Sequence, residues 1–224
     1  TAHHNLLYDA GPLSRSGFDA GAAIVVPALR AQGIDQLHRL IISHGDADHA
    51  GGQASLQRAL KINDVIDPNH PDCRNQRAYK IDGVNFQLLS WQGGTNRNNR
   101  SCLLQVTGPG FNLVLSGDIE VDAELALLNN LQGKVDWLMV PHHGSRTSSS
   151  PAFLNHLMPQ WAVIAAGFNN AFRHPHPEIV TRYRNRGAHV ISTAEQGALI
   201  FKADRKGLHW VLSARPARQR FWSD

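Results

Sequence analysis

The chain has 224 residues, 42% of them hydrophobic, with 22 Lys and Arg against 18 Asp and Glu. This length can bury a proper core in one large domain or two small ones, and the composition excludes a disordered chain and a small scaffold built on disulfides. The longest apolar runs, such as residues 22–29, fall far short of the roughly 18 residues that span a bilayer. No signal peptide is predicted, and we expect a soluble unit.

The net charge of +4 is unevenly distributed along the chain. Residues 1–170 carry 12 basic and 14 acidic side chains, whereas residues 171–224 carry 10 basic and 4 acidic ones. A basic C-terminal part favours an anionic partner such as nucleic acid or a membrane surface. An ordinary solvated surface accounts for a charge of this size equally well.

The two cysteines, Cys73 and Cys102, lie far apart and form no CxxC motif. A zinc knuckle and a thioredoxin-like motif are therefore excluded. The cysteines either pair in an oxidising compartment or are two unrelated thiols.

The first part of the chain alternates predicted strands with predicted helices. We expect strands at residues 5–8, 39–43 and 65–66 and helices at residues 19–31 and 52–60. Asp19 is expected to cap the first helix and Gly33 to end it. Residues 67–78 are rich in Pro, Asn and Arg and predict a polar loop.

The second part begins with two predicted hairpins. Residues 79–81 and 84–89 flank the strong turn Asp82-Gly83, and residues 101–107 and 111–115 flank a Gly-Pro-Gly turn. Beyond them we expect helices at 120–131, 150–157 and 177–186 and strands at 135–140, 161–165, 189–192, 198–202 and 208–212. Hairpins mixed with separate helices imply mixed sheets covered by helices, in an α/β or an α+β arrangement.

The strongest functional signal is a cluster of candidate metal ligands directly after the predicted strand 39–43. His44, Asp46, Asp48 and His49 lie within six positions. Imidazole and carboxylate groups together suit divalent metal ions. An incidental polar loop needs neither an apolar strand before it nor further ligands elsewhere in the chain, so we interpret the cluster as a metal site.

Three further strand ends carry residues of the same kind. Asp118 follows the second hairpin, His142 and His143 follow the next strand, and His174 and His176 are additional site candidates before the last helix. Alone, each position has an ordinary structural explanation: a turn, packing, or a rigid helix entry. Together with the first cluster, they predict four ligand-bearing strand ends at a single rim of one sheet.

This set of residues resembles the metallo-β-lactamase superfamily, whose signature is HxHxDH after a strand with a distal Asp and a distal His. Within it, the chain is similar to the C-terminal domain of ComEC competence proteins, bacterial membrane channels that take up transforming DNA. The similarity is carried by SGFDAG (16–21), SHGDADHAGG (43–52), SGDIE (116–120), VPHHGSRTSSS (140–150) and HPHPE (174–178). It implies an α+β fold, a four-layer αββα sandwich with mixed sheets, over residues 1–213, and a basic and aromatic tail at 214–224.

The sequence departs from the superfamily pattern at the first metal site. Asp46 replaces the second His of HxHxDH, and the usual mid-chain His is missing, with Asn98, Asn99 or Ser101 in about that stretch. A first site of His44, Asp46 and Asp118, with an Asn oxygen, is rich in oxygen and favours Mn²⁺, with Mg²⁺ or Zn²⁺ as other candidates. Alternatively, the first site has decayed and binds metal weakly.

The second metal site implied by the resemblance comprises Asp48, His49 and His143, with Asp118 bridging two divalent ions. Two such ions can lower the pKa of a bound water and clamp both oxygens of an in-line displacement at phosphorus. We therefore expect a two-metal centre at which an activated hydroxide attacks a phosphodiester.

Catalytic roles are expected for Asp48, His142 and Ser145. Asp48 would orient the attacking hydroxide, and His142 would hydrogen-bond the scissile phosphate or protonate the leaving oxygen. Ser145 would hold a non-bridging phosphate oxygen. Asp9, at a neighbouring strand end, is expected to support the ligand loop rather than to bind metal.

The resemblance implies a deoxyribonuclease that degrades the DNA strand that is not transported. The phosphate contacts are expected from Arg97, Arg100, Arg146 and Arg173. The tail combines cations with aromatics, as single-strand binding surfaces do, or is a frayed end. Its residues of this kind are Arg215, Arg218, Arg220, Phe221 and Trp222.

The implied partners are single-stranded DNA and the remainder of a membrane channel protein. The implied location is the periplasmic side of a bacterial inner membrane, where this part would be a soluble domain. Three other functions stay open: a metallohydrolase acting on a phosphocholine ester or a lactone, a non-catalytic DNA-binding module with a decayed site, and a structural cap on the channel.

Overall fold

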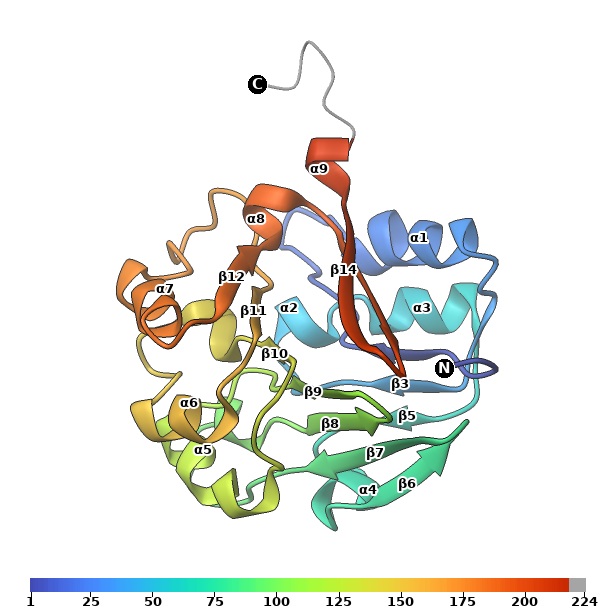
Figure 1. Ribbon diagram of the computed structural model, residues 1–224. Helices are drawn as coiled ribbons and strands as arrows, with labels where there is room; N and C mark the ends of the chain where they lie inside the picture. The colour runs from blue at the N-terminus through green and yellow to red at the C-terminus, as the bar shows by residue number, and fades with distance from the viewer. Residues whose placement is uncertain (218–224) are drawn as a thin grey trace. The chain divides into compact units, whose positions relative to one another are not determined.

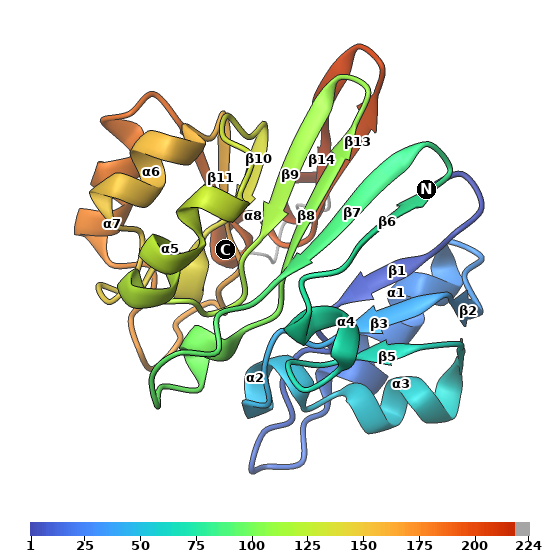
Figure 2. The same ribbon diagram turned by 90° about the horizontal axis from the view of Figure 1, so that it is seen from below.

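A computed structural model describes residues 1–217, which belong to two compact units, Thr1–Leu104 and Gln105–Asp224 (Figures 1 and 2). The boundary between them falls within strand β8 (Leu103–Gly108). No helix within residues 1–217 is both long and apolar enough to cross a membrane. The predicted tail residues Arg218, Arg220, Phe221 and Trp222 lie outside the described residues.

The first unit is built on a parallel sheet with the strand order β1-β3-β5. These strands are β1 (Leu6–Tyr8), β3 (Arg39–Ile41) and β5 (Val65–Ile66), and a second parallel pair joins β2 (Gln36–Leu37) to β4 (Lys61–Ile62). The helical segments are η1 (Gly21–Val25), α1 (Val26–Ala31), α2 (Ala47–Ala50), α3 (Gln53–Ala59), α4 (Pro71–Arg74) and η2 (Asn98–Arg100). Helices α1 and α3 lie next to each other on one side of this sheet (Figures 1 and 2).

The core of the first unit fixes the entry to the ligand-rich segment. Leu37, Leu40 and Leu56 are fully buried and pack together between the strands and the helices. A side chain at Gly52 would come within 2.3 Å of the Ala10 carbonyl oxygen, so only glycine allows α3 to begin this close to the end of β1. This close packing holds the segment between β3 and α3 against the first strand.

The predicted helix at 19–31 forms, but its first part is wound as a π-helix. In η1 the N–H of Val26 bonds to the carbonyl of Gly21, five residues back. Pro27 has no N–H to donate to the carbonyl four residues before it, which removes an α-helical hydrogen bond at this point. Asp19 caps the segment as predicted, because its Oδ1 accepts the N–H of Ala22 at 3.1 Å.

The first predicted hairpin is confirmed, and the loop before it is partly wrong. Strands β6 (Ala78–Ile81) and β7 (Val84–Leu89) pair around Asp82 and Gly83, both of which have positive φ. The segment predicted as a polar loop contains α4, whose N-cap His70 accepts the N–H of Asp72 through its ring. A helix of four residues is too short to show a helical period.

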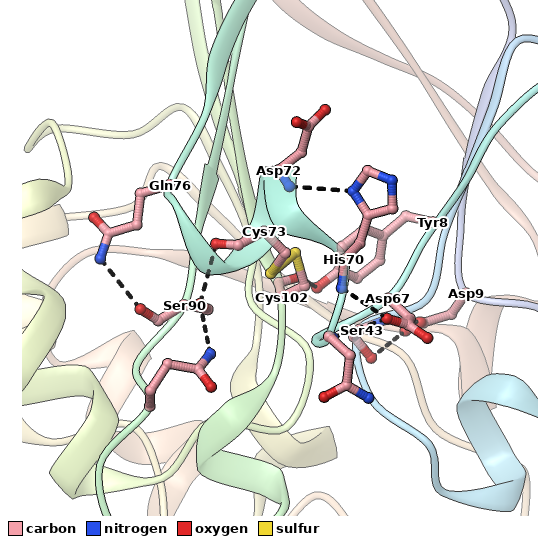
Figure 3. The surroundings of a disulfide bond; sticks show 12 residues. Tyr8, Asp9, Ser43, Asp67, His70, Asp72, Cys73, Gln76, Ser90 and Cys102 are labelled. Carbon is pink, nitrogen blue, oxygen red and sulfur yellow. Dashed lines mark hydrogen bonds between the residues drawn. A yellow bond between two sulfur atoms is a disulfide. The ribbon is translucent and has the colours of Figure 1, made fainter.

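A disulfide joins Cys73 in α4 to Cys102, which settles the open alternative for the two cysteines (Figure 3). Cys102 also contacts the ligand-rich segment: its N–H donates to the Ser43 carbonyl at 2.7 Å, and its own carbonyl accepts the hydroxyl of Tyr8 at 2.8 Å. The disulfide therefore ties α4 to backbone that touches both β1 and the segment after β3.

The second unit is built on parallel strands that pair in the order β9-β10-β11-β12. These are β9 (Phe111–Leu115), β10 (Trp137–Met139), β11 (Trp161–Ile164) and β12 (His189–Ser192). Helices α5 (Val121–Leu127), α6 (Pro151–Leu157) and α7 (Pro177–Arg184) lie on one side of them (Figure 2). The other segments are η3 (Leu128–Asn130), η4 (Pro141–Gly144), α8 (Thr193–Gln196), β13 (Leu199–Asp204), β14 (Gly207–Ser213) and α9 (Ala214–Ala217).

An aromatic cluster attaches the β13–β14 hairpin to these strands. The ring of Trp161 in β11 lies 5.6 Å from the ring of Phe201 and 5.6 Å from the ring of Trp210, both in edge-on geometry. Trp137 in β10 contacts Phe201 as well, at 6.2 Å. Edge-on aromatic pairs stabilise the contact beyond the burial of the rings themselves. The hairpin therefore packs against these strands through its side chains, while its own two strands form a separate sheet.

A buried carboxylate holds the chain between η4 and α6. Glu124 in α5 accepts the backbone N–H groups of Ser149 and Ser150, and Arg182 of α7 donates to the Ser149 carbonyl at 2.7 Å. The Ser149 hydroxyl and the Tyr183 hydroxyl are 3.0 Å apart. Burial raises the pKa of the Glu124 carboxyl, and the hydrogen bonds from Ser150 and Ser149 oppose this rise.

Loss of the disulfide is expected to lower the free energy of unfolding by about 3.5 kcal/mol, because the bond closes a loop between residues 29 positions apart. The measurement is urea denaturation of the oxidised protein, the reduced protein and a Cys73→Ser/Cys102→Ser variant. Equal stability of the three would contradict a role for the bond in the folded state.

The stability of the protein is expected to fall as pH rises from the ordinary Glu124 value of 4.5 through the raised folded pKa. The folded state binds this proton more tightly than the unfolded state does, so raising the pH favours unfolding. In a Glu124→Gln variant this group no longer titrates. The unfolding free energy of wild type minus that of the variant should therefore fall with rising pH in that window. A constant difference would contradict the assignment.

Candidate metal centre

In the first unit, the carboxylate of Asp9 organises the loop after β3. The parallel pairing of Tyr8 with Ile41 places Asp9 beside this loop. Its Oδ1 accepts the N–H of Ser43 at 2.7 Å, and its Oδ2 accepts the Ser43 hydroxyl at 3.0 Å and lies 2.7 Å from Nδ1 of His49. A carboxylate only accepts hydrogen bonds, so Nδ1 of His49 carries the proton and Nε2 carries the lone pair that a metal ion needs.

The same serine orients His44. Both imidazoles are buried, and the Ser43 oxygen lies 3.1 Å from Nδ1 of each ring. Because the Ser43 hydroxyl donates to Asp9, its oxygen acts as an acceptor toward the ring N–H of His44. His44 therefore also presents Nε2 as its ligand atom.

The two other carboxylates of this loop face different partners. Oδ2 of Asp48 lies 3.8 Å from Nε2 of His49, and the Asp48 side chain is half exposed. Oδ2 of Asp46 lies 3.7 Å from Nε2 of His44, while its Oδ1 pairs with Nη2 of Arg97 at 3.0 Å. Arg97, predicted to contact DNA, is thus an ion-pair partner of a predicted metal ligand.

The remaining predicted residues of the first unit lie in and around η2. Asn99 is buried, and Arg100 donates from Nη2 to the Gly94 carbonyl at 3.0 Å. Cys102 is bonded to the Ser43 carbonyl only three positions beyond Asn99. The segment that is predicted to replace the mid-chain histidine is therefore hydrogen-bonded to the start of the loop after β3.

In the second unit, His143 is prepared for a metal in the same way as His49. Its Nδ1 donates to the Ala165 carbonyl at 2.6 Å, which leaves the lone pair on Nε2. That Nε2 lies 3.5 Å from Oδ2 of Asp118, at the end of β9. The N–H of His142 donates to the Gly117 carbonyl at 3.2 Å. The segment that follows β10 is therefore hydrogen-bonded to the segment that follows β9.

The backbone of this segment is strained. His142, His143 and Gly144 have φ values of 49°, 54° and 84°, three consecutive residues in the left-handed region. The two histidines each pay of the order of 1–3 kcal/mol for this conformation, a strain found preferentially at functional sites. Gly144 is required, because a side chain there would come within 2.7 Å of Pro175. Asp9 in the first unit has the same conformation, with φ 63°.

His142 is held by polar groups on both ring nitrogens. Nδ1 lies 3.3 Å from Oε1 of Glu120 and 3.2 Å from the Thr147 hydroxyl, and Nε2 lies 3.8 Å from Oδ2 of Asp118. The Thr147 hydroxyl is also 3.1 Å from the hydroxyl of Ser145, which is buried. His142 and Ser145, two predicted catalytic residues, thus share Thr147 as a hydrogen-bond partner.

His174 and His176 join this group of imidazoles. The His174 ring lies 5.8 Å from that of His142 and 5.2 Å from that of His176. Burial lowers the pKa of His174, and the neighbouring charges of His142, His143 and His176 lower it further. Of the predicted DNA contacts in this unit, Arg146 pairs with Glu178 at 3.6 Å and Arg173 lines a pocket.

The prediction of one rim on one sheet is wrong. His44, Asp46, Asp48 and His49 follow β3 of the first unit's sheet, whereas Asp118, His142, His143, His174 and His176 follow β9, β10 and β11 of the second unit's sheet. Sequence pattern shows that a strand ends in a ligand, but not which sheet that strand joins.

Sequence reasoning also missed the groups that orient the imidazoles. Ser43 and Glu120 lie inside the quoted motifs, yet no role was assigned to them. The acceptor for His143 is the Ala165 backbone carbonyl, a group that every residue carries and that therefore leaves no signal in the sequence.

Comparison with known proteins identifies the family. The sequence profile of the metallo-β-lactamase superfamily matches residues 1–72. The chain is 36% identical to competence protein ComA of Neisseria gonorrhoeae, over 93% of this chain and 30% of that protein. It is 34% identical to recombination protein 2 of Haemophilus influenzae, over 86% of this chain and 25% of that protein. The chain thus spans less than a third of the length of these relatives.

The solved structures agree on the fold. A metal-dependent hydrolase of the β-lactamase superfamily matches 84% of this chain and 85% of its own, with a TM-score of 0.50 at 14% identity. The class defined by these matches is that of the metallo-β-lactamase fold. The chain belongs to the metallo-β-lactamase superfamily with its α+β fold, as predicted, and within it the chain is related to the competence proteins.

Asp9→Asn is expected to weaken the binding of a divalent metal by about 10- to 100-fold, because it removes the carboxylate that fixes the tautomer of His49. The measurement is titration of metal-free protein with Mn²⁺ or Zn²⁺ in competition with a chelating dye. Asp35→Asn, an exposed position in the same unit, is the matched control. Equal affinities for all three proteins would contradict the orienting role.

Proposed function

We propose that this chain is a metal-dependent nuclease that hydrolyses DNA, with Asp48, His49, Asp118 and His143 as ligands of a divalent metal ion. The observation that carries the proposal is the shared preparation of His49 and His143. Each ring donates its Nδ1–H to a fixed oxygen, which is how proteins orient metal-binding histidines. A structural cap would not require it.

A second ion is part of the proposal. His44 and Asp46 would hold it together with Asp118, and the oxygen-rich set favours Mn²⁺ over Zn²⁺. When bound, divalent ions supply Lewis acidity that neutralises charge on a phosphodiester. The buried Asn99 is the nearby candidate for a further oxygen.

The chain's own residues supply the proton transfer. Hydrolysis joins a water oxygen to phosphorus, breaks the ester P–O bond and requires a proton on the leaving oxygen. His142 is the proposed donor of that proton, with its ring held through Nδ1 by Glu120 and Thr147. Ser145 and Arg146 are proposed to hold the phosphate, once Arg146 exchanges Glu178 for it.

DNA as the substrate, and an extracytoplasmic location, rest on further support. One of the relatives is a competence protein and the other a recombination protein, and residues 171–224 carry 10 basic side chains against 4 acidic ones. The disulfide between Cys73 and Cys102 suits an oxidising compartment such as the periplasm. We propose a periplasmic nuclease domain within a longer membrane protein that degrades one strand of incoming DNA.

Asp48→Ala and His143→Ala are expected to lose at least a hundredfold in DNA cleavage, because each change removes a proposed ligand. The measurement is cleavage of single- and double-stranded DNA with Mn²⁺, Mg²⁺ or Zn²⁺, with Asp35→Asn as the control. Bis(p-nitrophenyl) phosphate and a lactone test for other substrates. Cleavage that is absent in wild type, or unchanged in the variants, would sink the nuclease proposal.

The number of bound ions tests the two-metal part separately. Wild type is expected to bind two Mn²⁺ per chain, and Asp46→Ala one, by equilibrium dialysis with elemental analysis. If wild type binds one ion and Asp46→Ala binds the same amount, the first site has decayed. Tighter binding and higher activity with Zn²⁺ than with Mn²⁺ would contradict the preference argued from the oxygen ligands.

A further inference from the structure

The loop between β11 and α7 exposes two phenyl rings to solvent. Phe168 is 66% exposed and Phe172 is 75% exposed, the highest values among the large hydrophobic side chains within residues 1–217. The shallow pocket beside them, about 490 Å³ in volume, is lined by Phe168, Arg173 and His174 among others. Neither phenyl ring contributes to the core of its unit, so packing does not explain them.

The loop is nevertheless held in one shape. The Asn170 side chain donates to the carbonyls of Gly167 and His174, at 3.0 and 2.6 Å, and accepts the N–H of His174 at 2.9 Å. The start of the loop is fixed by the Thr193 hydroxyl, which accepts the N–H of Ala166 at 3.0 Å. The two rings are therefore presented by an ordered loop, which lowers the entropy lost when a ligand binds.

Cations and imidazoles surround the two rings. The Arg215 guanidinium lies 5.3 Å from the centroid of Phe168, and the ring of His174 stacks on Phe172 at 5.8 Å and 26°. Arg173 lines the pocket, and none of the residues that line it is acidic. Exposed aromatic faces beside arginines match a ligand that combines planar rings with negative charge.

We propose that this loop binds unpaired bases of single-stranded DNA, with Phe168 and Phe172 as stacking platforms and Arg173 and Arg215 against the phosphates. The inference rests on the proposed function, which it deepens by adding a base-binding subsite. His174 connects the subsite to the proposed catalytic group, because its ring contacts both Phe172 and His142.

The test measures binding without cleavage. Fluorescence anisotropy with a labelled oligothymidine in EDTA should show binding weakened about tenfold or more by Phe168→Ala/Phe172→Ala, since stacking on an aromatic ring is worth roughly 1–3 kcal/mol per base. Phe168→Trp/Phe172→Trp should retain wild-type affinity, whereas Phe168→Leu/Phe172→Leu should not. Leu125→Ala/Met158→Ala, two other exposed apolar residues of this unit, is the matched control. Thermal melting checks that every variant folds.

An abasic strand of the same length separates stacking from charge. Wild type and the double alanine variant should bind it equally, because it keeps the phosphates and lacks the bases. Equal binding of oligothymidine by these two proteins, no measurable binding by wild type, or an equal loss of abasic binding in the variant would each overturn the proposal. The proposal would also be overturned if the double alanine variant lost only binding to anionic vesicles and kept its binding to oligothymidine. Binding without cleavage in Mn²⁺ would instead overturn the nuclease and leave the subsite standing.

Discussion

The hydrogen bonds of Asp9 are the constraint on which the first half of the candidate centre depends. One carboxylate takes the N–H and the hydroxyl of Ser43 and the ring N–H of His49. These three bonds suit Asp9 to orient the proposed ligands rather than to serve as one. The arrangement requires β1 and β3 to pair in their observed register, since a shift of one residue would turn Asp9 to the other face of the sheet.

The second unit reaches the same result by other means. The Ala165 carbonyl replaces the carboxylate as the acceptor for His143, and a left-handed backbone at His142 and His143 aims the two rings. Backbone hydrogen bonds hold that conformation: the N–H of His142 donates to the Gly117 carbonyl, that of Ser145 to the His142 carbonyl, and that of His176 to the Gly144 carbonyl. Both units thus fix Nδ1 of a histidine and leave Nε2 as the candidate ligand atom.

Features that depend on residues close together in the sequence could be predicted from it. The strand ends that carry His49, Asp118 and His143 could be predicted because apolar runs and ligand spacing are local. Helix α4 has only four residues, which is too short for a helical period to be detected. The pairing of Cys73 with Cys102 depends on tertiary proximity. The division of the ligands between two sheets is likewise a matter of strand pairing, which no local pattern specifies.

Asp46 shows how one replacement changes the electrostatics of the centre. An imidazole at this position carries no negative charge and could not form an ion pair with Arg97, whereas the carboxylate does so at 3.0 Å. The Arg97 side chain is 78% exposed, and an ion pair so accessible to water contributes about 0–1 kcal/mol. A divalent ion bound by several ligands gains far more than that, so this pair would not prevent Asp46 from binding a metal ion.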